Sequence, residues 1–269
     1  MSIKFLKSIL VVWIVFLSFS SYAQVKMDTN YVLPAGEDIH YRIYYKLGNL
    51  WVYAAIANFK TDTMTFEGKK VYKLSVDAFS RKKYDWIYSL EDHYTSYTDM
   101  ESFLPLKFEK YNIEKGITYH NIYEFNWETK EVRMFISRSD NGNITETKKL
   151  PDFITDSYSA VQYLRTWDYG SLKEGKHLKF QTILDGKIFQ QEIIYHGKEM
   201  VKDKNGNEVE AFKLEAPIKN SSFFSKKEGV LVWIADNKER WIIKVSAKIV
   251  VGSIIVFLDE PGMVSFDRH

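Results

Sequence analysis

A two-residue alternation of apolar and polar side chains constrains the fold of this chain more than any other feature. In residues 37–47, every second side chain is apolar or aromatic: Ile39, Tyr41, Ile43, Tyr45 and Leu47. Alternation of this kind predicts a strand with one buried face. Similar stretches are Lys70–Phe79, Trp86–Thr98, Phe103–Tyr111, Thr118–Asn126, Glu131–Ser137, Leu178–Leu184, Ile188–Tyr195, Glu208–Glu215, Gly229–Ala235, Trp241–Ile249 and Ser253–Leu258. The chain is therefore predicted to be all-β.

Short turns separate several of the predicted strands. Asp140–Asn143, Asp185-Gly186 and Asn205–Asn207 contain the Asn, Asp and Gly residues that accept the positive φ of tight hairpins. Connections this short make neighbouring strands antiparallel, because a parallel pair needs a crossover of about a dozen residues or more. A meander of this length must protect its edge strands, and curling or closure does so. We expect a single strongly bent antiparallel sheet or an open β-barrel.

One helix interrupts the strands. Asp156 or Ser157 can cap its first turn, and apolar residues then recur at helical spacing through Arg165, which predicts a helix over Ser157–Thr166 that packs through Val161 and Leu164. No Gly/Ser-rich or charged linker flanks this segment. Because all-β domains of about 200–250 residues are common, residues 24–269 are expected to form a single all-β domain with one inserted α-helix.

The first 23 residues indicate export. Lys4 and Lys7 precede an apolar run of eleven residues, Ile9–Phe19, and Ser21-Tyr22-Ala23 provides small residues at a cleavage site before Gln24. The apolar region of a signal peptide spans about 7–15 residues, whereas a membrane-spanning helix needs about 20, so an uncleaved anchor fits less well. Residues 1–23 are therefore predicted to be a signal peptide, and residues 24–269 a soluble periplasmic or secreted protein that does not span the membrane.

The charge of the predicted mature chain argues against a nucleic acid partner. Cleavage would remove two of the 37 basic residues and none of the 35 acidic ones, which leaves a net charge of zero. Phosphate-rich partners require a clustered basic excess. The chain has no cysteine, so neither a disulfide nor a lipid attached to an N-terminal cysteine is available.

No catalytic, metal-binding or cofactor motif is evident. The six histidines are scattered, and the densest group of potential ligands is Glu91-Asp92-His93 with Asp99, which we interpret as a solvated strand face. The chain has no Gly-x-Ser-x-Gly elbow, and cysteine catalysis is excluded. Paired carboxylates for glycoside cleavage are defined by their separation in space, which a sequence cannot test. The sequence favours a protein that is not an enzyme and has no cofactor.

Aromatic residues are the one compositional excess, at 16 % of the chain. If the bent sheet encloses a lipid or glycan ligand, we expect small residues to leave the volume and rings to form the walls. The predicted lining combines Ala54, Ala55 and Ala57 with Trp51, Tyr53, Trp86 and Trp233. The competing interpretation is that these rings are ordinary strand residues and that a facing Phe or Tyr fills the space beside the alanines.

Three stretches together resemble the bacterial family catalogued as domain of unknown function 3108. They are Ala35-Gly36-Glu37 before Ile39–Ile43; Asp156–Ala160 through Leu164-Arg165, with Gly170 and Gly175 after it; and Val232–Asp236 with Lys244-Val245 and Val251–Ile254, including Gly252. The resemblance covers residues 33–259 and implies an exported, bent β-sheet protein without assigning an activity. Asp236-Asn237 departs from the acid pair expected there. From the residues themselves, Gly36-Glu37 is interpreted as a turn into the first strand, Asp156 as a helix cap and Arg165 as a buried or bridging partner.

These observations rank three functions. The first is non-catalytic binding of an apolar or glycan-like ligand within the curved sheet of an exported envelope protein. The second is an envelope assembly factor that binds another protein along a sheet edge. The third is a hydrolase without a recognisable motif. A cavity would favour the first, an exposed apolar edge the second, and convergent carboxylates or histidines the third.

Overall fold

The computed structural model describes residues 25–84, 89–114, 116–218 and 229–259, most of which form one sheet of fifteen strands. The strands of the first group are β1 (Glu37–Leu47), β2 (Leu50–Phe66), β3 (Lys69–Ser80), β4 (Leu90–Asp99), β5 (Pro105–Glu114), β6 (Ile117–Asn126), β7 (Glu131–Arg138) and β8 (Gly142–Lys149). The strands of the second group are β9 (Thr155–Asp156), β10 (His177–Leu184), β11 (Lys187–Lys202), β12 (Glu208–Ala216), β13 (Val230–Ala235), β14 (Ile242–Lys248) and β15 (Ser253–Leu258).

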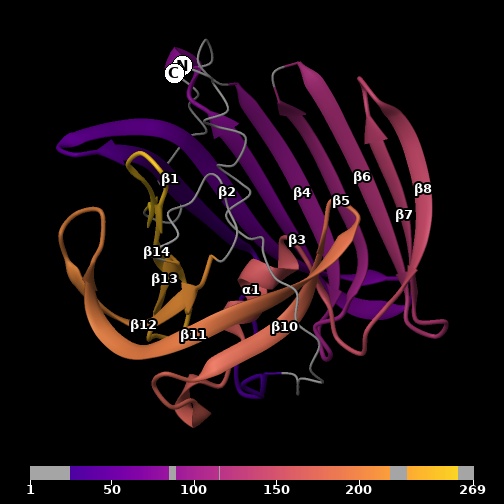
Figure 1. Cartoon of the computed structure of the whole chain (residues 1–269). Coiled ribbons are helices and arrows are strands. Elements are labelled where there is room, and N and C mark those ends of the chain that lie inside the picture. The colour runs from indigo at the N-terminus through magenta and orange to yellow at the C-terminus, as the bar shows by residue number, and fades with distance from the viewer. Residues whose placement is uncertain (1–24, 85–88, 115, 219–228, 260–269) are drawn as a thin grey trace.

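The two groups are meanders that meet where β1 pairs with β15. From that seam, one meander runs outward from β1 to β8 and the other from β15 back to β9 (Figure 1). All neighbouring strands are antiparallel except β9 and β10, whose pairing is parallel. The prediction of a single, strongly bent antiparallel sheet is confirmed.

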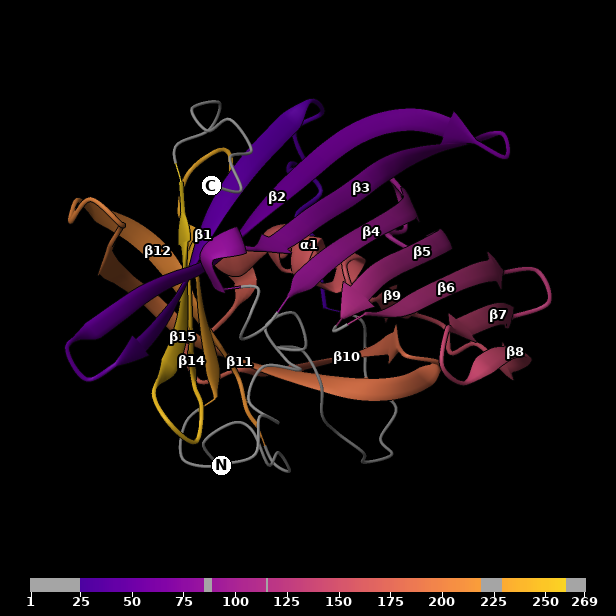
Figure 2. The ribbon, with the colours of Figure 1, turned by 90° about the horizontal axis from the view of Figure 1, so that it is seen from above.

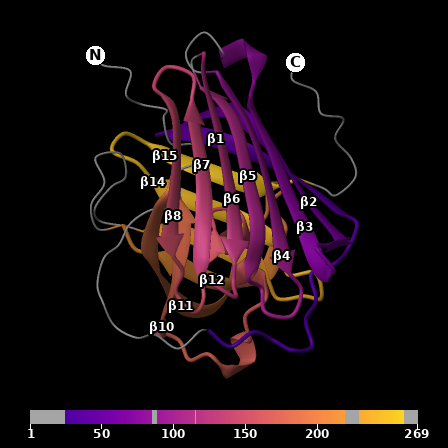
Figure 3. The ribbon, with the colours of Figure 1, turned by 90° about the vertical axis from the view of Figure 1, so that its right-hand side faces the viewer.

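The sheet curls until its second half reaches the inner face of its first. The β10–β11 hairpin turns at Asp185-Gly186, where both residues have positive φ, as the sequence predicted for a tight turn. Lys110 on β5 donates to Asp185 at 2.8 Å, and Lys148 on β8 donates to the carbonyl of Gly186 at 2.6 Å. Figures 2 and 3 show the resulting open barrel, with β4–β8 on one side and β11–β15 on the other.

The helix α1 (Ser159–Arg165) lies in the hollow of the curled sheet (Figure 2), and all seven of its residues are buried. It falls within the segment predicted to be helical, and Val161 and Leu164 are both in the core. Asp156 lies two residues before its N-cap position, Tyr158, and satisfies the first amide of the helix, because its Oδ1 accepts from the amides of Tyr158 and Ser159 at 2.9 and 2.8 Å. Two short 3₁₀ helices, Lys82–Tyr84 and Tyr169–Ser171, complete the elements in the described ranges.

Two long strands, β2 and β8, are not among the stretches that alternation identified. β2 contains the run Val52–Ala57, whose apolar residues do not alternate, and β8 has a polar sequence with no buried face. The predicted strand Phe103–Tyr111 starts later than expected: β5 begins at Pro105, because Phe103 has a φ of +59° that ends the preceding turn. Strand pairing, rather than alternation, places these segments in the sheet.

Two sequence predictions lie outside the described residues. These are the signal peptide at residues 1–23 and the aromatic residue Trp86. Within the ranges that the structure describes, no helix has the length and apolar character needed to cross a membrane.

Candidate functional site

Three of the four aromatic residues predicted to bind a ligand lie on the outer face of the sheet. Tyr53 stacks on Tyr44 of the neighbouring strand, with ring centroids 5.3 Å apart, and Trp51 meets the same ring at 6.0 Å. Trp233 is farther along this face, under the ammonium groups of Lys213 and Lys244 at 5.9 and 5.0 Å. These rings therefore form part of a row of aromatic and cationic side chains outside the hollow.

The alanines predicted to line a cavity with those rings lie on the opposite face. Ala55 and Ala57 pair with Ile43 and Tyr41, whose side chains are buried in the core. The ring of Tyr41 lies 4.8 Å from that of Phe59 on the same face. The predicted shared lining is therefore wrong, because bulky neighbours fill the space beside the alanines. Ala54 is assigned to neither face, since it lies in a bulge of β2 and has no pairing partner on β1.

Two of the pockets in the part of the chain that the structure describes are well defined, and neither of these two touches Trp51, Tyr53 or Trp233. The larger, about 870 Å³, is an open groove at the ends of β2, β5, β6 and β7, and half of the residues that line it are charged, with both signs present. The smaller, about 190 Å³, lies beside Asp259, whose buried carboxylate is paired with Arg42 and Lys204. In neither pocket does a buried polar group lack a hydrogen-bond partner. We therefore look for the candidate site outside these two pockets.

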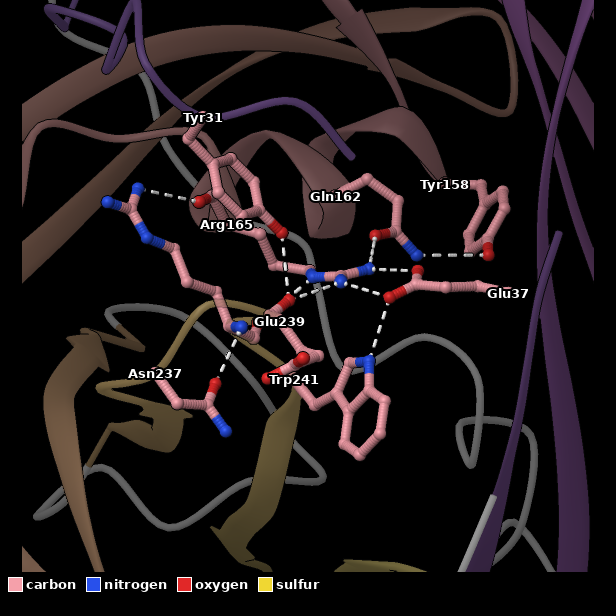
Figure 4. A network of polar contacts seen from close by, with 9 residues as sticks. Tyr31, Glu37, Tyr158, Gln162, Arg165, Asn237, Glu239 and Trp241 are labelled. Carbon is pink, nitrogen blue, oxygen red and sulfur yellow. Dashed lines mark hydrogen bonds and ion pairs between the residues drawn. The ribbon is translucent and has the colours of Figure 1, made fainter. Parts of the chain in front are cut away.

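A buried ion pair holds the helix against the sheet (Figure 4). Arg165 donates to both oxygens of Glu37, at 2.8 and 2.7 Å. Its remaining donors reach Gln162 Oε1 at 2.8 Å and the carbonyls of Glu239 and Arg240 at 2.7 and 3.0 Å. All five N–H groups of the guanidinium are thus satisfied.

The same network joins three parts of the chain that are distant in sequence. Glu37 opens β1, Arg165 ends α1, and the indole of Trp241, next to β14, donates to Glu37 Oε1 at 2.7 Å. The Tyr31 hydroxyl also donates to the carbonyl of Glu239, at 2.8 Å. Because no donor of Arg165 is left for a ligand, we interpret this network as structural.

A second group of buried polar residues lies on the inner face of β4, β5 and β6, and its hydrogen bonds are incomplete. Asp92, Asn112 and Asn121 are only 1–3 % exposed, and Lys110 beside them is also buried. Asp92 pairs directly with Asn112 across β4 and β5, and Lys110 with Asn121 across β5 and β6. Directly paired residues of an antiparallel sheet have Cβ atoms about 5 Å apart, so the four side chains form one cluster, which we name the inner polar patch.

Three oxygen atoms of the inner polar patch have no hydrogen-bond partner: Asp92 Oδ1, Asn112 Oδ1 and Asn121 Oδ1. In two of these side chains, the second polar atom does have a partner: Tyr94 donates to Asp92 Oδ2 at 3.3 Å, and Asn112 Nδ2 donates to Glu114 at 3.1 Å. Leaving a buried acceptor unpaired costs about 1–3 kcal/mol. Native proteins seldom accept this cost, so a cluster of three such atoms is a candidate place for water, an ion or a ligand to bind.

Electrostatics distinguish the same cluster. Burial raises the pKa of Asp92 to about 7, and the negative charge of Glu114 adds to the effect, while Lys110 partly opposes it. A strongly shifted carboxyl in a buried cluster is a property of functional sites as well as of structural ion pairs. The rings of Tyr94, Phe108 and Tyr123 continue this wall toward the core, with successive centroids 6.2 and 5.5 Å apart.

The sequence analysis missed the inner polar patch because it interpreted the group Glu91-Asp92-His93 with Asp99 as solvated strand residues. That interpretation is wrong for Asp92. Glu91 and His93 do lie on the outer face, where His93 is 2.6 Å from Asp77 and 3.4 Å from Glu91, but Asp92 points inward. The alternation of β4 contained the signal, since Asp92 shares its face with Tyr94, whose ring is in the core.

The other motif residues occupy turns and caps. Gly36 has a φ of +79° immediately before β1, and Gly252 a φ of +87° in the β14–β15 hairpin. Asp236 follows β13 and pairs with Lys198, while Asn237 Oδ1 accepts from the amide of Arg240 at 2.9 Å. Asn237, the departure from the expected acid pair, thus closes the turn between β13 and β14.

Residues 40–259 match the model of the family described as protein of unknown function DUF3108. The chain belongs to this family. Its DUF3108 region contains the whole inner polar patch and Arg165, whereas Glu37 lies just before it. No curated protein matches the chain.

A solved structure supports the fold of this DUF3108 member. The crystal structure of a beta-barrel-like protein of domain of unknown function DUF1849 from Brucella abortus is similar, with a TM-score of 0.51 and 9 % sequence identity. The match covers 86 % of this chain and 100 % of that one. At this identity, the likeness concerns the barrel-like fold alone.

Proposed function

We propose that this DUF3108 protein is an exported, non-catalytic binding protein that holds a hydroxylated, glycan-like ligand against the inner polar patch. The observation that carries the proposal is the set of three buried oxygens without a partner, on Asp92, Asn112 and Asn121. A ligand that donates O–H or N–H groups satisfies all three. Binding accounts for these atoms without any reaction step.

The chemistry of the wall favours a hydroxylated ligand over an apolar one. An apolar ligand would leave the three acceptors unpaired and would remove any water that serves them. A metal cation fits less well, because the ammonium group of Lys110 belongs to the same cluster. Rings beside polar anchors are a common arrangement in ligand sites, and Tyr94 and Phe108 provide such rings here.

The assembly-factor alternative receives less support from the sheet edge. The edge strand β8 exposes nearly its whole length, but its sequence is polar apart from Ile144, and it ends in Lys148 and Lys149. Lysines on an edge strand oppose pairing with another strand. We therefore do not propose strand addition at this edge.

Native mass spectrometry of the protein recovered from its own envelope tests the proposal. We expect a bound species whose released mass and composition are those of a saccharide or another polyol. The double variant Asn112→Leu/Asn121→Leu removes two of the three acceptors at nearly constant volume and should lose that species. Asn58→Leu is the matched control, because Asn58 is also a buried asparagine with an unpaired oxygen but lies on the outer face of β2.

Two results would contradict the proposal. One is a protein that carries no adduct, and the other is an adduct that survives in the double variant as well as in the control. A purely apolar adduct would mean that the ligand is a lipid rather than a glycan-like molecule, and that it binds at a place other than the inner polar patch.

Export is the second part of the proposal and has its own measurement. The two lysines, the eleven-residue apolar run and Ser21-Tyr22-Ala23 support it. The intact mass of the protein recovered from the periplasm should correspond to a chain that begins at Gln24. A mass that includes residues 1–23 would mean an anchored protein.

A further inference from the structure

Two neighbouring hairpins expose an unusual concentration of large apolar side chains. The β1–β2 hairpin exposes Leu47, Leu50 and Trp51, and the β14–β15 hairpin exposes Val250 and Val251. These five, which we name the apolar tip, are 42–64 % exposed and make up half of the ten exposed large apolar side chains in the described ranges. Contiguous exposure of this kind marks an interaction surface, whereas single exposed residues do not.

The two hairpins are fixed side by side. Lys46 pairs with Ser253 where β1 meets β15, and the Tyr45 hydroxyl donates to the carbonyl of Val251 at 3.1 Å. Gly252 lies so close to β1 that a Cβ atom there would be 2.4 Å from the carbonyl oxygen of Lys46. In Figures 1 and 2, the indigo and yellow hairpins project near each other. The apolar tip is therefore one preformed surface.

The two loop segments that carry the apolar tip contain basic residues and no acidic ones. Residues 46–51 and 248–253 contain Lys46 and Lys248 and no acidic residue. The Lys46 ammonium lies 4.8 Å from the centre of the Trp51 ring. Behind it on the outer face is Lys244, whose pKa is lowered by burial and by the positive charge of Lys46. The lysines beside the exposed apolar side chains make this surface suited to an anionic partner.

We propose that the apolar tip is a docking site for the surface of an anionic lipid bilayer. Short apolar loops enter the headgroup region, tryptophan is enriched at that depth, and each lysine near an anionic leaflet adds to the attraction. A soluble anionic ligand would use the lysines but would gain nothing from four exposed aliphatic side chains. A second copy of the chain would bring its own lysines against these. The inference is independent of the ligand proposed for the hollow.

Vesicle co-sedimentation of the exported protein, with its mass checked to begin at Gln24, tests this inference. We expect binding to vesicles with about one third phosphatidylglycerol, weaker binding to pure phosphatidylcholine, and a decline as salt is added. The variant Leu47→Ser/Leu50→Ser/Val250→Ser/Val251→Ser should bind at least about tenfold more weakly. The control Met64→Ser/Ile144→Ser/Met200→Ser removes equally exposed apolar side chains from other strands and should bind like the wild type.

A second variant keeps the test valid if the serine variant fails to fold. Lys46→Gln/Lys248→Gln leaves the apolar side chains in place and should reduce the preference for anionic vesicles several-fold. The proposal is wrong if the wild type binds no vesicle, or if the tip variants bind as well as the wild type. It is also wrong if the tip instead drives self-association, seen as an oligomer that the serine variant converts to a monomer without any vesicle binding.

Discussion

The carboxylate of Glu37 and the guanidinium of Arg165 form a two-bonded ion pair at 2.7 and 2.8 Å, with side chains that are 6 % and 2 % exposed. They are separated by 128 positions in the sequence, and their contact joins the first strand of the sheet to the end of its only described α-helix. The helix is only seven residues long, too short to be stable by itself in water. Its position therefore depends on this pair and on the core.

Removing one partner of this pair should be costly. Glu37→Gln leaves the buried guanidinium of Arg165 without a counter-charge, and we expect a loss of about 3–5 kcal/mol in the free energy of unfolding, measured by urea denaturation. Glu124→Gln is the control, since Glu124 and Arg133 form an exposed pair at 4.0 Å whose loss should cost less than about 1 kcal/mol. Equal effects of the two substitutions would show that Arg165 does not depend on Glu37.

Truncating a buried side chain of the helix should also lower the stability of the fold. Leu164 is completely buried, so Leu164→Ala should cost about 2–5 kcal/mol in the free energy of unfolding, through lost burial and the cavity left behind. Ile144→Ala on the exposed strand β8 should cost less than about 1 kcal/mol. A mild effect at Leu164 would mean that the helix is only loosely packed in the hollow.

Asp92 makes stability depend on pH in a defined direction. Its pKa is about 7 in the folded protein, whereas that of an exposed aspartate is 3.8, so folding favours the protonated form. The contribution is fully present below about pH 4 and is lost as the pH rises through about 7. Asparagine cannot ionise, so the Asp92→Asn variant does not lose this stability as the pH rises. The variant should therefore be more stable than the wild type at pH 8, by up to about 4 kcal/mol in the free energy of unfolding.

Urea denaturation of both proteins from pH 4 to pH 8 checks the sign. The advantage of the Asn variant should shrink toward zero as the pH falls to about 4. A wild type that gains stability relative to the Asn variant as the pH rises would contradict the burial of a shifted carboxyl at this position.

Gly252 and Gly206 provide a matched pair for the contact between the two hairpins. Both have a φ near +90°, but a Cβ atom on Gly252 would collide with the carbonyl of Lys46, whereas one on Gly206 would meet nothing within 4 Å. Gly206→Ala should therefore cost only backbone strain, about 1–2 kcal/mol. Gly252→Ala should cost clearly more, as measured by thermal or urea unfolding. Equal costs would mean that the hairpins are not in close contact.

Local patterns in the sequence predicted much of the fold. The alternation at residues 37–47 coincides with β1, and Asp185-Gly186 forms the expected tight turn. The hydrogen bonds of Asp156 at the start of the helix and the buried Leu164 follow from helical spacing. By contrast, β8 was not predicted, because an edge strand whose residues are nearly all exposed has no apolar face to reveal it.

The candidate site could not be predicted, because it depends on which face of each strand turns inward and on which strands become neighbours. Asp92 and Asn112 are separated by 20 positions and meet only through the register of β4 and β5. The aromatic residues chosen from the sequence illustrate the same limit. Trp51 and Ala55 lie on one strand, yet a bulge between them alters the alternation, so that one faces outward and the other faces the core.

A crystal structure of the protein purified from the cells that naturally produce it would test the central claim most directly. We predict density for a polyhydroxylated molecule in the hollow of the sheet, with donors about 2.6–3.2 Å from Asp92 Oδ1, Asn112 Oδ1 and Asn121 Oδ1. The same crystals of the Asn112→Leu/Asn121→Leu variant should lack it. Three oxygens satisfied only by ordered water, or by side chains of the protein itself, would contradict the account.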